Sequence, residues 1–389
     1  MKIWHYIRRI ISFSRFVKEK EISKKSDKSY FEIIFHFMRL SRKKQFSFDE
    51  YYKYEFDKQS EEFIASFLSE SEQSPLIRLL NPKKYYIIAR NKYFAHLFLE
   101  KTGITKTDLY CYYHPEGRYV ENDGIGYDYH SVRVILKSKN VESCVIKTTE
   151  SSYGEGVIVI KKIDYREDDC YMHSFNERVI KLKEILKYEP LIFEQVIRQT
   201  AQFKGFNPTS VNTVRFMTTL YPDGNAYIIG TFVKIGRAGS CVDNAGAGGN
   251  IDVGVDIESG KIFKVTQFDG WRKTRSITHH PDTGALLEGV VIENWDSIKE
   301  TVISFQKSMP FLKAVGWDIA ITDKGPVVVE LNDNWDTTGQ LFIGRGWRNK
   351  IRECYYEWKK LVDAGLVSYW SGRGIDLAYI KLTKDKSKI

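Results

Sequence analysis

The segment from Cys144 to Asn332 contains a succession of short apolar runs, separated by turn residues, that restricts the fold more than any other feature of the chain. Most of these runs are rich in valine, isoleucine, phenylalanine and tyrosine, which favour strands. Two pairs of runs are joined by turn sequences, the first through Pro222 to Gly224 and the second through Lys324 and Gly325. We therefore expect antiparallel hairpins within β-sheets in this part of the chain.

The chain on either side of this segment has helical patterns. Residues 1–20 place isoleucines and Val17 along one stripe, flanked by lysines and arginines, which predicts a basic amphipathic helix. Such a helix suits an anionic membrane surface, although docking on its own protein or on a second subunit is the simpler interpretation. Residues 30–80 are helical and charge-rich, residues 85–104 predict a strand followed by a helix, and the chain returns to helix after residue 344.

Length, charge and cysteine usage limit the class of protein. A chain of 389 residues is too long for one ordinary core, so two or three lobes around a shared cleft are expected. The formal charge of +9 attracts polyanions, but it does not distinguish nucleotide phosphates from acidic polysaccharide, anionic lipid or nucleic acid. The five cysteines lack zinc spacing, and their odd number argues against a complete disulfide framework, so a reducing cytoplasm is expected. No apolar stretch reaches the roughly 20 residues that span a bilayer, and we expect neither a signal peptide nor a membrane span.

Acidic and amide side chains lie on the last pair of predicted strands, with Asp318 on one strand and Glu330 and Asn332 on the other. Glu330 and Asn332 project from the same face, because side chains on a strand alternate with a period of two. The hairpin turn brings Asp318 across to them, so that three oxygen ligands of the kind Mg²⁺ prefers converge. The pattern predicts a magnesium site; the alternative is the polar face of an exposed hairpin.

A lysine and a Ser/Gly loop lie between two earlier predicted strands, in the run VIKTTESSYGEGVIVI. Lys147 is placed to neutralise phosphate charge, while Gly154 and Gly156 allow close approach of backbone amides. The run is not a P-loop, because the lysine precedes the glycines and no helix follows. The next strand ends at Glu194 and Val196, which suits a hinge that offers backbone groups to an adenine edge. For the glycines, the alternative is a simple hairpin turn.

Two arginines and a glycine-rich loop form a third group. Arg215 and Arg237 lie on neighbouring strands if the hairpin prediction holds, and the planar guanidinium suits bidentate contact with phosphate or carboxylate. Asn244 precedes a run that contains Gly248 and Gly249, whose amides are suited to bind an oxyanion. The alternative for this loop is a flexible surface turn.

A further motif, HHPDTG, contains His279, His280 and Asp282. These side chains are candidates for contact with a donor or acceptor substrate. The alternative is that the Pro-Asp-Thr-Gly run forms a tight turn without a direct role.

The order of these parts resembles the ATP-grasp superfamily over roughly residues 85–350: lysine, hinge acid, arginines, Gly-Gly loop, then an acid and Glu-x-Asn. Within the superfamily, the chain most resembles the sugar-transfer-associated ATP-grasp proteins of polysaccharide biosynthesis, through the runs SVNTVRFMT, NAGAGGNIDVGVD and HHPDTGALLEGVVIENW. The resemblance implies an α+β fold in which two α+β lobes clasp ATP, preceded by a mainly helical or small α/β lobe. We accordingly expect a helical region at 1–82, a leading α/β lobe at 83–140, a central lobe at 141–200, a C-terminal lobe with the metal site at 201–350 and a helical tail at 351–389.

The resemblance also implies roles for individual residues. Lys92 and Lys147 would hold the ATP phosphates with help from Gly154 and Gly156, and Asn91 stands where the superfamily usually has an aspartate. Glu194 and Val196 resemble the adenine hinge. The residues that resemble the catalytic set are Arg215, Arg237, Asn244, Gly248 and Gly249. The residues that match the metal ligands are Asp318, Glu330 and Asn332.

The implied activity is an ATP- and magnesium-dependent ligase that makes an acyl phosphate from a carboxylate and transfers the acyl group to an amine or hydroxyl. The expected cofactors are ATP and two Mg²⁺ ions, with Mn²⁺ as a substitute. The expected substrates are an amino acid or similar carboxylate and a sugar or amine acceptor of surface polysaccharide or capsule synthesis. No nucleic acid is expected. Peripheral contact of residues 1–20 with the inner face of the membrane is the alternative to their docking on the protein itself or on a second subunit.

Two other functions fit parts of the pattern. An ATP-grasp phosphotransferase would use the same ATP and metal residues to phosphorylate a hydroxyl group without ligation. A non-catalytic basic module would bind polysaccharide or membrane, and the interleaved tyrosines and basic residues favour it, although no nucleic-acid motif is present.

Overall fold

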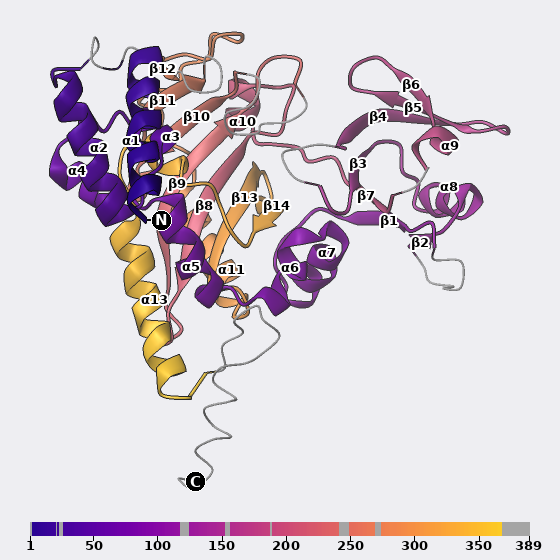
Figure 1. Cartoon of the computed structure of the whole chain (residues 1–389). Helices are drawn as coiled ribbons and strands as arrows, with labels where there is room; N and C mark the ends of the chain where they lie inside the picture. Colours follow the sequence, from indigo (N-terminus) through magenta and orange to yellow (C-terminus); the bar gives the residue numbers. More distant parts are fainter. Residues whose placement is uncertain are drawn as a thin grey trace, which may run out of the picture. The chain divides into compact units, whose positions relative to one another are not determined.

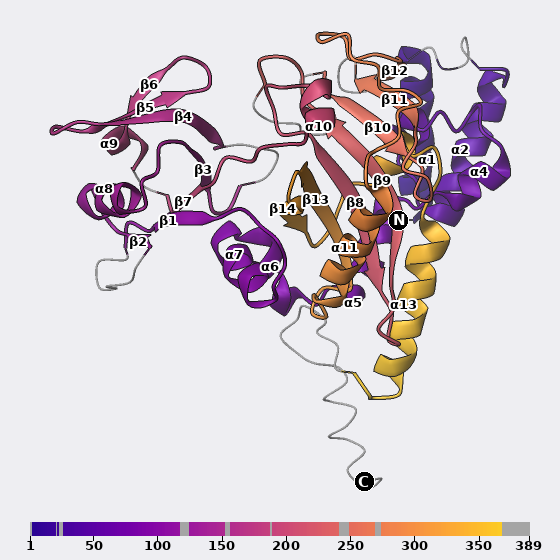
Figure 2. The same cartoon turned by 180° about the vertical axis from the view of Figure 1, so that it is seen from behind.

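The computed structural model describes residues 2–20, 22, 26–116, 124–151, 156–186, 189–240, 249–268 and 274–367. The chain divides into two compact units, one formed by Met1–Leu80 with Asn334–Ile389 and the other by Asn81–Asp333. Figure 1 labels their helices and strands, and Figure 2 shows them from behind. The division into five segments expected from the sequence remains a proposal.

The first unit consists of helices in the part of the chain that the structure describes. Its helices are α1 (Lys2–Glu19), α2 (Tyr30–Lys44), α3 (Phe48–Lys53), α4 (Glu61–Ser66), α5 (Glu70–Leu80), α12 (Gly339–Phe342) and α13 (Arg348–Asp363). Capping boxes at Ser29 and Ser47 begin α2 and α3. Each serine hydroxyl accepts a hydrogen bond from the backbone amide of the glutamate three residues later, and the carboxylate of that glutamate accepts one from the backbone amide of the serine. The helical pattern predicted for 30–80 is therefore confirmed, and α13 confirms the return to helix after residue 344 as far as residue 363, whereas 368–389 lie outside the described residues.

An aromatic core holds the first unit together. Phe13 and Val17 of α1 are fully buried in it, and the Phe13 ring stacks on Phe37 of α2 with 3.8 Å between ring centroids. The described part of α1 thus docks within its own unit, as the simpler interpretation of residues 1–20 predicted. Among the residues described here, no helix is long and apolar enough to cross a bilayer.

The second unit contains two seven-stranded sheets. The first sheet has the order β2-β1-β7-β3-β4-β5-β6, and helix α8 packs on β1 and β2 while α9 packs on β5 and β6. Its strands are β1 (Leu109–Tyr113), β2 (Ile125–Gly126), β3 (Cys144–Thr148), β4 (Ile158–Tyr165), β5 (Cys170–Ser174), β6 (Val179–Lys181) and β7 (Leu191–Glu194). The two helices are α8 (Tyr129–Ser138) and α9 (Leu182–Ile185). All four residues of β7 are buried, so this strand lies in the middle of the core.

The second sheet has the order β12-β11-β10-β9-β8-β13-β14, and helix α11 packs on β8, β9 and β14. Its strands are β8 (Thr213–Leu220), β9 (Ala226–Ile235), β10 (Ile251–Val255), β11 (Ile262–Phe268), β12 (Thr274–Ser276), β13 (Ala314–Thr322) and β14 (Gly325–Asn332). The helices between these strands or before them are α10 (Ala201–Phe206) and α11 (Trp295–Lys307).

Both hairpins predicted from turn sequences are present in the second sheet. Strands β8 and β9 pair antiparallel, as do β13 and β14. The second turn is formed by Asp323 and Lys324, one residue earlier than predicted, and Gly325 begins β14 with a φ of 103°. Antiparallel pairing places Asp318 opposite both Glu330 and Arg215, so the three side chains share one face of the sheet.

The prediction of a strand at the start of 85–104 is wrong. This segment forms a 3₁₀ turn η2 (Lys83–Tyr85) and two helices, α6 (Ile87–Arg90) and α7 (Lys92–Lys101). Ile88 and Ala89 pack on the core of the second sheet, and Arg90 makes a bidentate ion pair with Asp333 at 2.8 Å. These tertiary contacts outweigh the strand preference of the local tyrosines and isoleucines.

Candidate functional site

A pocket in the second unit is lined by five charged residues; Lys106 precedes β1, and the other four come from four different elements. Lys92 comes from α7, Lys147 from β3, Glu194 from β7 and Glu330 from β14. Apolar side chains of α7, β7 and β14, among them Ile192, complete its lining. The pocket therefore combines an apolar wall with three lysines and two carboxylates, which is the mixture that a nucleotide with its metal requires.

The buried carboxylate of Glu194 is the centre of a polar network. It forms an ion pair with Lys147, lies 2.9 Å from Nε2 of His96 and accepts a 3.0 Å bond from the Thr107 hydroxyl. Burial alone would raise the pKa of Glu194, but Lys147 and His96 outweigh this effect and hold the pKa at about 2. Glu194 is consequently ionised at neutral pH, and it fixes the position of Lys147.

Lys92 reaches the pocket from the first turn of α7. Asn91 caps this helix, because its side-chain oxygen accepts bonds from the Tyr93 and Phe94 amides. The Lys92 ammonium donates to the Ser151 carbonyl at 2.8 Å and to its hydroxyl at 3.2 Å. Burial lowers the pKa of Lys92, partly offset by the nearby Glu330 carboxylate.

The structure describes only some of the residues that were expected to cover the phosphates or to contact the adenine edge. Gly156 has a φ of 72°, and a Cβ there would lie 2.8 Å from the Thr148 hydroxyl, so this position favours glycine. Gly154 lies outside the described residues. Val196 follows β7 and is half-buried, but it is not among the residues that line the pocket.

The three predicted metal ligands lie on adjoining positions of β13 and β14, but they are not equivalent. Both oxygens of Asp318 are held by Arg215, at 2.5 and 2.7 Å, and Lys234 lies 3.1 Å from one of them. Burial would raise the pKa of Asp318, yet Arg215 and Lys234 hold it at about 2. Asp318 is thus an ionised carboxylate that two cations already neutralise.

Glu330 and Asn332 form the more accessible part of this oxygen set. Among the described residues, no hydrogen bond or ion pair engages the Glu330 carboxylate. The Asn332 amide nitrogen donates to the Gly316 carbonyl at 3.2 Å, which leaves its oxygen as an acceptor. A carboxylate and an amide oxygen on one strand face fit a magnesium ion, with Asp318 beside them. In the described ranges, no group of three or more His, Cys, Asp or Glu residues is arranged so that it could hold a metal ion.

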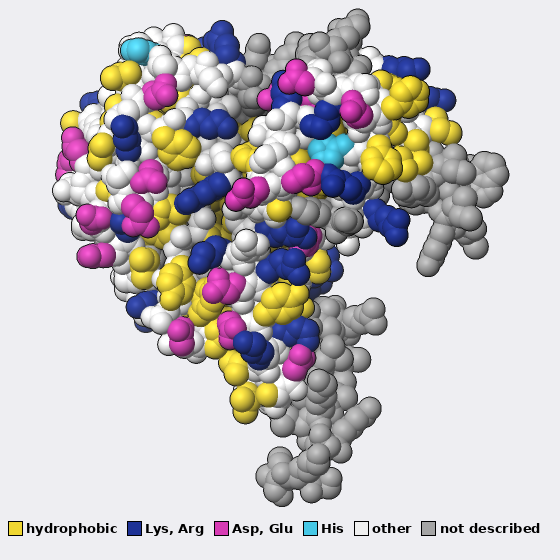
Figure 3. Space-filling view, turned by 90° about the vertical axis from the view of Figure 1, so that its left-hand side faces the viewer, with side chains coloured by type: hydrophobic (Ala, Val, Ile, Leu, Met, Phe, Trp, Pro, Cys, Tyr) yellow, Lys and Arg dark blue, Asp and Glu magenta, His cyan; other side chains and the backbone are white. Residues whose placement is uncertain are grey.

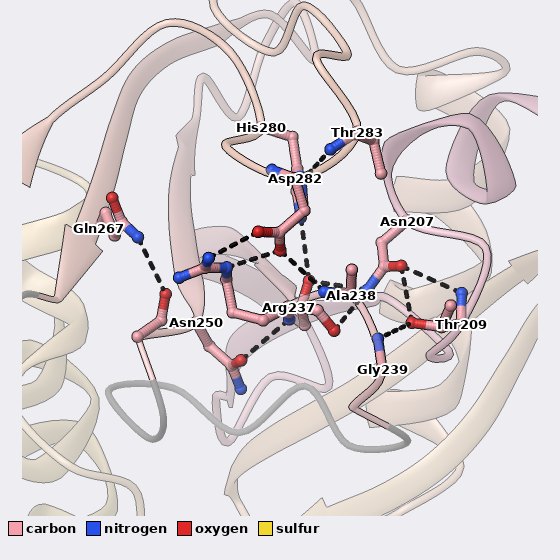
Figure 4. Close-up of polar contacts among 12 residues, drawn as sticks. Asn207, Thr209, Arg237, Ala238, Gly239, Asn250, Gln267, His280, Asp282 and Thr283 are labelled. Atoms are coloured by element: carbon pink, nitrogen blue, oxygen red, sulfur yellow. Dashed lines mark hydrogen bonds and ion pairs between the residues drawn. The ribbon is translucent and has the colours of Figure 1, made fainter. Parts of the chain in front are cut away.

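Arg215 and Arg237, predicted on neighbouring strands, are held by different carboxylates. Arg215 lies on β8, and Arg237 lies just after the end of β9. Figure 4 shows that Arg237 points to Asp282, with two bonds of 2.6 Å, while the Ala238 amide donates to the same carboxylate at 2.8 Å. The Arg237 side-chain bonds are the main cause that lowers the pKa of Asp282 to about 2.

The HHPDTG motif is therefore joined to Arg237 and is more than an isolated turn. His280 is almost fully buried and lies 3.0 Å from the Gly236 carbonyl through Nε2, while its Nδ1 accepts from the Asp282 and Thr283 amides (Figure 4). His279 is exposed and contacts the hydroxyl of Thr278. Of the predicted oxyanion loop, Asn244 and Gly248 lie outside the described residues, and Gly249 has a φ of 77°.

Sequence reasoning missed three side chains that hold these groups. His96 lies four residues after Lys92, so it shares a face of α7 with it, and this spacing was a usable signal. Lys234 is a lysine within an apolar strand, where a buried charge requires a partner. Thr107 carries no comparable signal, because only the fold brings it to Glu194.

Comparison with known proteins gives a family match. A model described as "Sugar-transfer associated ATP-grasp" matches residues 71–354. No match was found among curated proteins.

Several solved structures are similar at low identity. Phosphoribosylamine–glycine ligase from Thermotoga maritima is 14% identical with a TM-score of 0.41, and the match covers 71% of this chain and 56% of that one. The biotin carboxylase domain of 2-oxoglutarate carboxylase from Hydrogenobacter thermophilus is 11% identical with a TM-score of 0.40, covering 71% and 48%. The D-Ala:D-Ser ligase from Enterococcus faecalis is 11% identical with a TM-score of 0.36, covering 68% and 61%. The chain thus matches less than two thirds of each of these proteins, and the likeness to them is weak.

Proposed function

This chain belongs to the sugar-transfer associated ATP-grasp family, and from that premise we propose that it joins an amino acid or similar carboxylate to an amine or hydroxyl of a sugar. The family match confirms the membership of the ATP-grasp superfamily and the α+β ATP-grasp fold that were predicted from the sequence. The ATP-dependent ligation of a carboxylate is part of the proposal. The carboxylate, the acceptor and the link to surface polysaccharide or capsule synthesis are proposals.

The observation that carries the proposal is the meeting of Lys92, Lys147, Glu194 and Glu330 at one pocket. In the proposed reaction, a carboxylate oxygen attacks the γ-phosphorus of ATP and the bond to the β-phosphate oxygen breaks, which gives an acyl phosphate and ADP. The acceptor's lone pair then attacks the acyl carbon, the bond to the phosphate oxygen breaks, and the acceptor loses its proton. Both steps concentrate negative charge, so fixed cations lower their barriers.

Each residue has a proposed part in this chemistry. Lys92 and Lys147 bind the phosphates, the strand that ends at Glu194 and continues to Val196 faces adenine, and Gly154 and Gly156 belong to the loop over the phosphates. Arg215 and Arg237 stabilise the transferred phosphoryl and acyl phosphate groups, with Asn244, Gly248 and Gly249 as the oxyanion loop. Asp318, Glu330 and Asn332 hold Mg²⁺, proposed as two ions with Mn²⁺ as a substitute, which would offset phosphate charge when bound.

The location is proposed from the same reasoning. We place the protein in the cytoplasm at the inner face of the membrane, with residues 1–20 near the lipid. Of the described side chains of α1, Phe13 and Val17 are buried, whereas Ile11, Arg15 and Lys18 are exposed and available for such contact.

ADP release from Mg-ATP tests the function, with a panel of amino acids and amino sugars supplied singly and in pairs. We expect turnover only when the right carboxylate and acceptor are both present, and loss of turnover in Glu330→Gln. Glu300→Gln, the same change at an exposed position of α11, is the matched control and should retain turnover. Phosphorylation of a hydroxyl compound without any carboxylate would contradict the ligase proposal and favour the phosphotransferase.

A further inference from the structure

The positive charge of the molecule is concentrated at its start. Residues 1–45 contain thirteen lysines and arginines against four acidic residues, so their net charge of +9 equals that of the whole chain. The remaining residues are neutral in sum. An excess confined to one segment creates a local positive field that attracts an anionic surface, whereas a dispersed excess would not.

Helix α2 presents an apolar pair to solvent inside this segment. Phe31 and Phe35, one turn apart, are 80% and 69% exposed. The opposite face of α2 is fixed, because Ile33, Phe37 and Leu40 are buried in the aromatic core. The phenylalanine pair is therefore held outward by the packing of the helix, and no rotation of α2 can bury it without exposing the core face.

Cations continue the same face of α2. Arg39 and Arg42 follow Phe35 at helical spacing, and both are exposed. Arg39 contacts Glu61 of α4, and that pair is exposed as well. The exposed acid next to Phe31 is Glu32, whose carboxylate is turned back to the Ser29 amide at 2.7 Å in the capping box. On the face of the molecule in Figure 3, hydrophobic and basic side chains are interspersed with acidic ones.

We propose that the outward face of α2, with Phe31 and Phe35 as apolar anchors and Arg39 and Arg42 as cations, docks on an anionic lipid bilayer. Aromatic rings are favoured at the depth of the headgroups, and lysines and arginines near the surface are attracted to anionic lipid. The capping box at Ser29 stabilises the start of α2 in the free protein, so the helix is already formed before it meets the membrane. Binding therefore does not have to order it. This inference does not depend on the ligase proposal, and it assigns the contact to α2 rather than to α1 alone.

Co-sedimentation of the full chain with lipid vesicles tests the proposal. We expect binding to vesicles that contain phosphatidylglycerol, little binding to pure phosphatidylcholine, and weakening as salt is added. The double variant Phe31→Ser/Phe35→Ser should bind about ten-fold less, because the buried apolar area is lost. Phe263→Ser, at an exposed position of β11, is the matched control and should bind like the unchanged protein.

Three results would overturn the proposal. These are absence of binding to anionic vesicles, binding that the double variant retains in full, and binding that inorganic phosphate abolishes at constant ionic strength. A self-association that is lost in the double variant, without lipid binding, would assign the face to a second copy of the chain instead. Both phenylalanines are exposed, so the variant should unfold at the same temperature as the unchanged protein, and this measurement controls for misfolding.

Discussion

Three of the cations proposed to bind phosphate are each held by a carboxylate of the chain itself. Lys147 pairs with Glu194, Arg215 with Asp318 and Arg237 with Asp282. Each carboxylate keeps its cation in place, which reduces the reorganisation needed when the substrate arrives. Each carboxylate also offsets part of the positive charge of its cation. Removing a carboxylate therefore changes both the position of the cation and the net charge that the phosphate meets.

Asp318 has a structural role that is separable from any magnesium. In Asp318→Asn, Arg215 and Lys234 lose their buried counter-charge, and we expect a loss of roughly 3–5 kcal/mol of unfolding free energy. Urea unfolding in the presence of a chelator measures this without metal. Asp323→Asn, in the exposed turn of the same hairpin, should have almost no effect.

The pH dependence of that stability has a definite sign. The pKa of Asp318 is lowered to about 2 in the folded protein, below the unfolded value near 3.9. Its contribution is therefore complete above the unfolded pKa and is lost as pH falls toward 2. Asp318→Asn should show a shallower loss of stability over this acid range, and an unchanged slope would contradict the assignment.

Asp282 is predicted to act through Arg237. In Asp282→Asn the bidentate clamp is lost, so the guanidinium becomes mobile, and we expect kcat of the ligase to fall about ten- to hundred-fold while KM for ATP stays constant. Stability should change by less than about 1 kcal/mol, because the pair is partly exposed. Steady-state kinetics measure this, with Asp223→Asn in an exposed turn as the control. Unaltered kcat with a lowered melting temperature would mean that Asp282 is only structural.

At the scale of elements, α7 connects helix formation to the proposed nucleotide site, because its cap, Asn91, directly precedes Lys92. Asn91→Ala removes the acceptor for the Tyr93 and Phe94 amides and should cost about 1 kcal/mol. KM for ATP should also rise, since Lys92 then starts from a frayed turn. Asn91→Ser retains a capping oxygen and should preserve most of both properties. Denaturant unfolding measures the stability of the two variants, and ATP titration measures their KM for ATP. If both variants lose stability and gain in KM to the same extent, the capping bond is not the cause.

Local signals predicted local structure well. The hairpins β8–β9 and β13–β14 were predictable because each is joined by a short turn, and period-two alternation placed Glu330 beside Asn332. The helices at 85–90 were not predictable, since the ion pair of Arg90 with Asp333 joins residues far apart in the chain. For the same reason the partners of Arg215 and Arg237 were missed. The roles of all these residues remain predictions.

At the scale of the whole molecule, the described residues proposed to bind ATP and magnesium all belong to the second unit, Asn81–Asp333. The first unit, by contrast, has its own aromatic core and carries the basic segment of residues 1–45. Ligand binding stabilises the parts of a protein whose opening would break the site. Nucleotide binding should therefore affect the two units unequally.

Amide hydrogen exchange with and without Mg-ATP tests this expectation. We expect slower exchange in β3, β7 and β14, which supply Lys147, Glu194 and Glu330, and little change in α2 and α13 of the first unit. In Glu330→Gln, the protection of β14 should depend less on magnesium, whereas Glu300→Gln should behave like the unchanged protein. If Mg-ATP slowed exchange equally in both units, the proposal that the second unit alone forms the site would be contradicted, because binding would then stabilise the whole chain. Protection confined to the three strands would link the proposed ligands to one binding event.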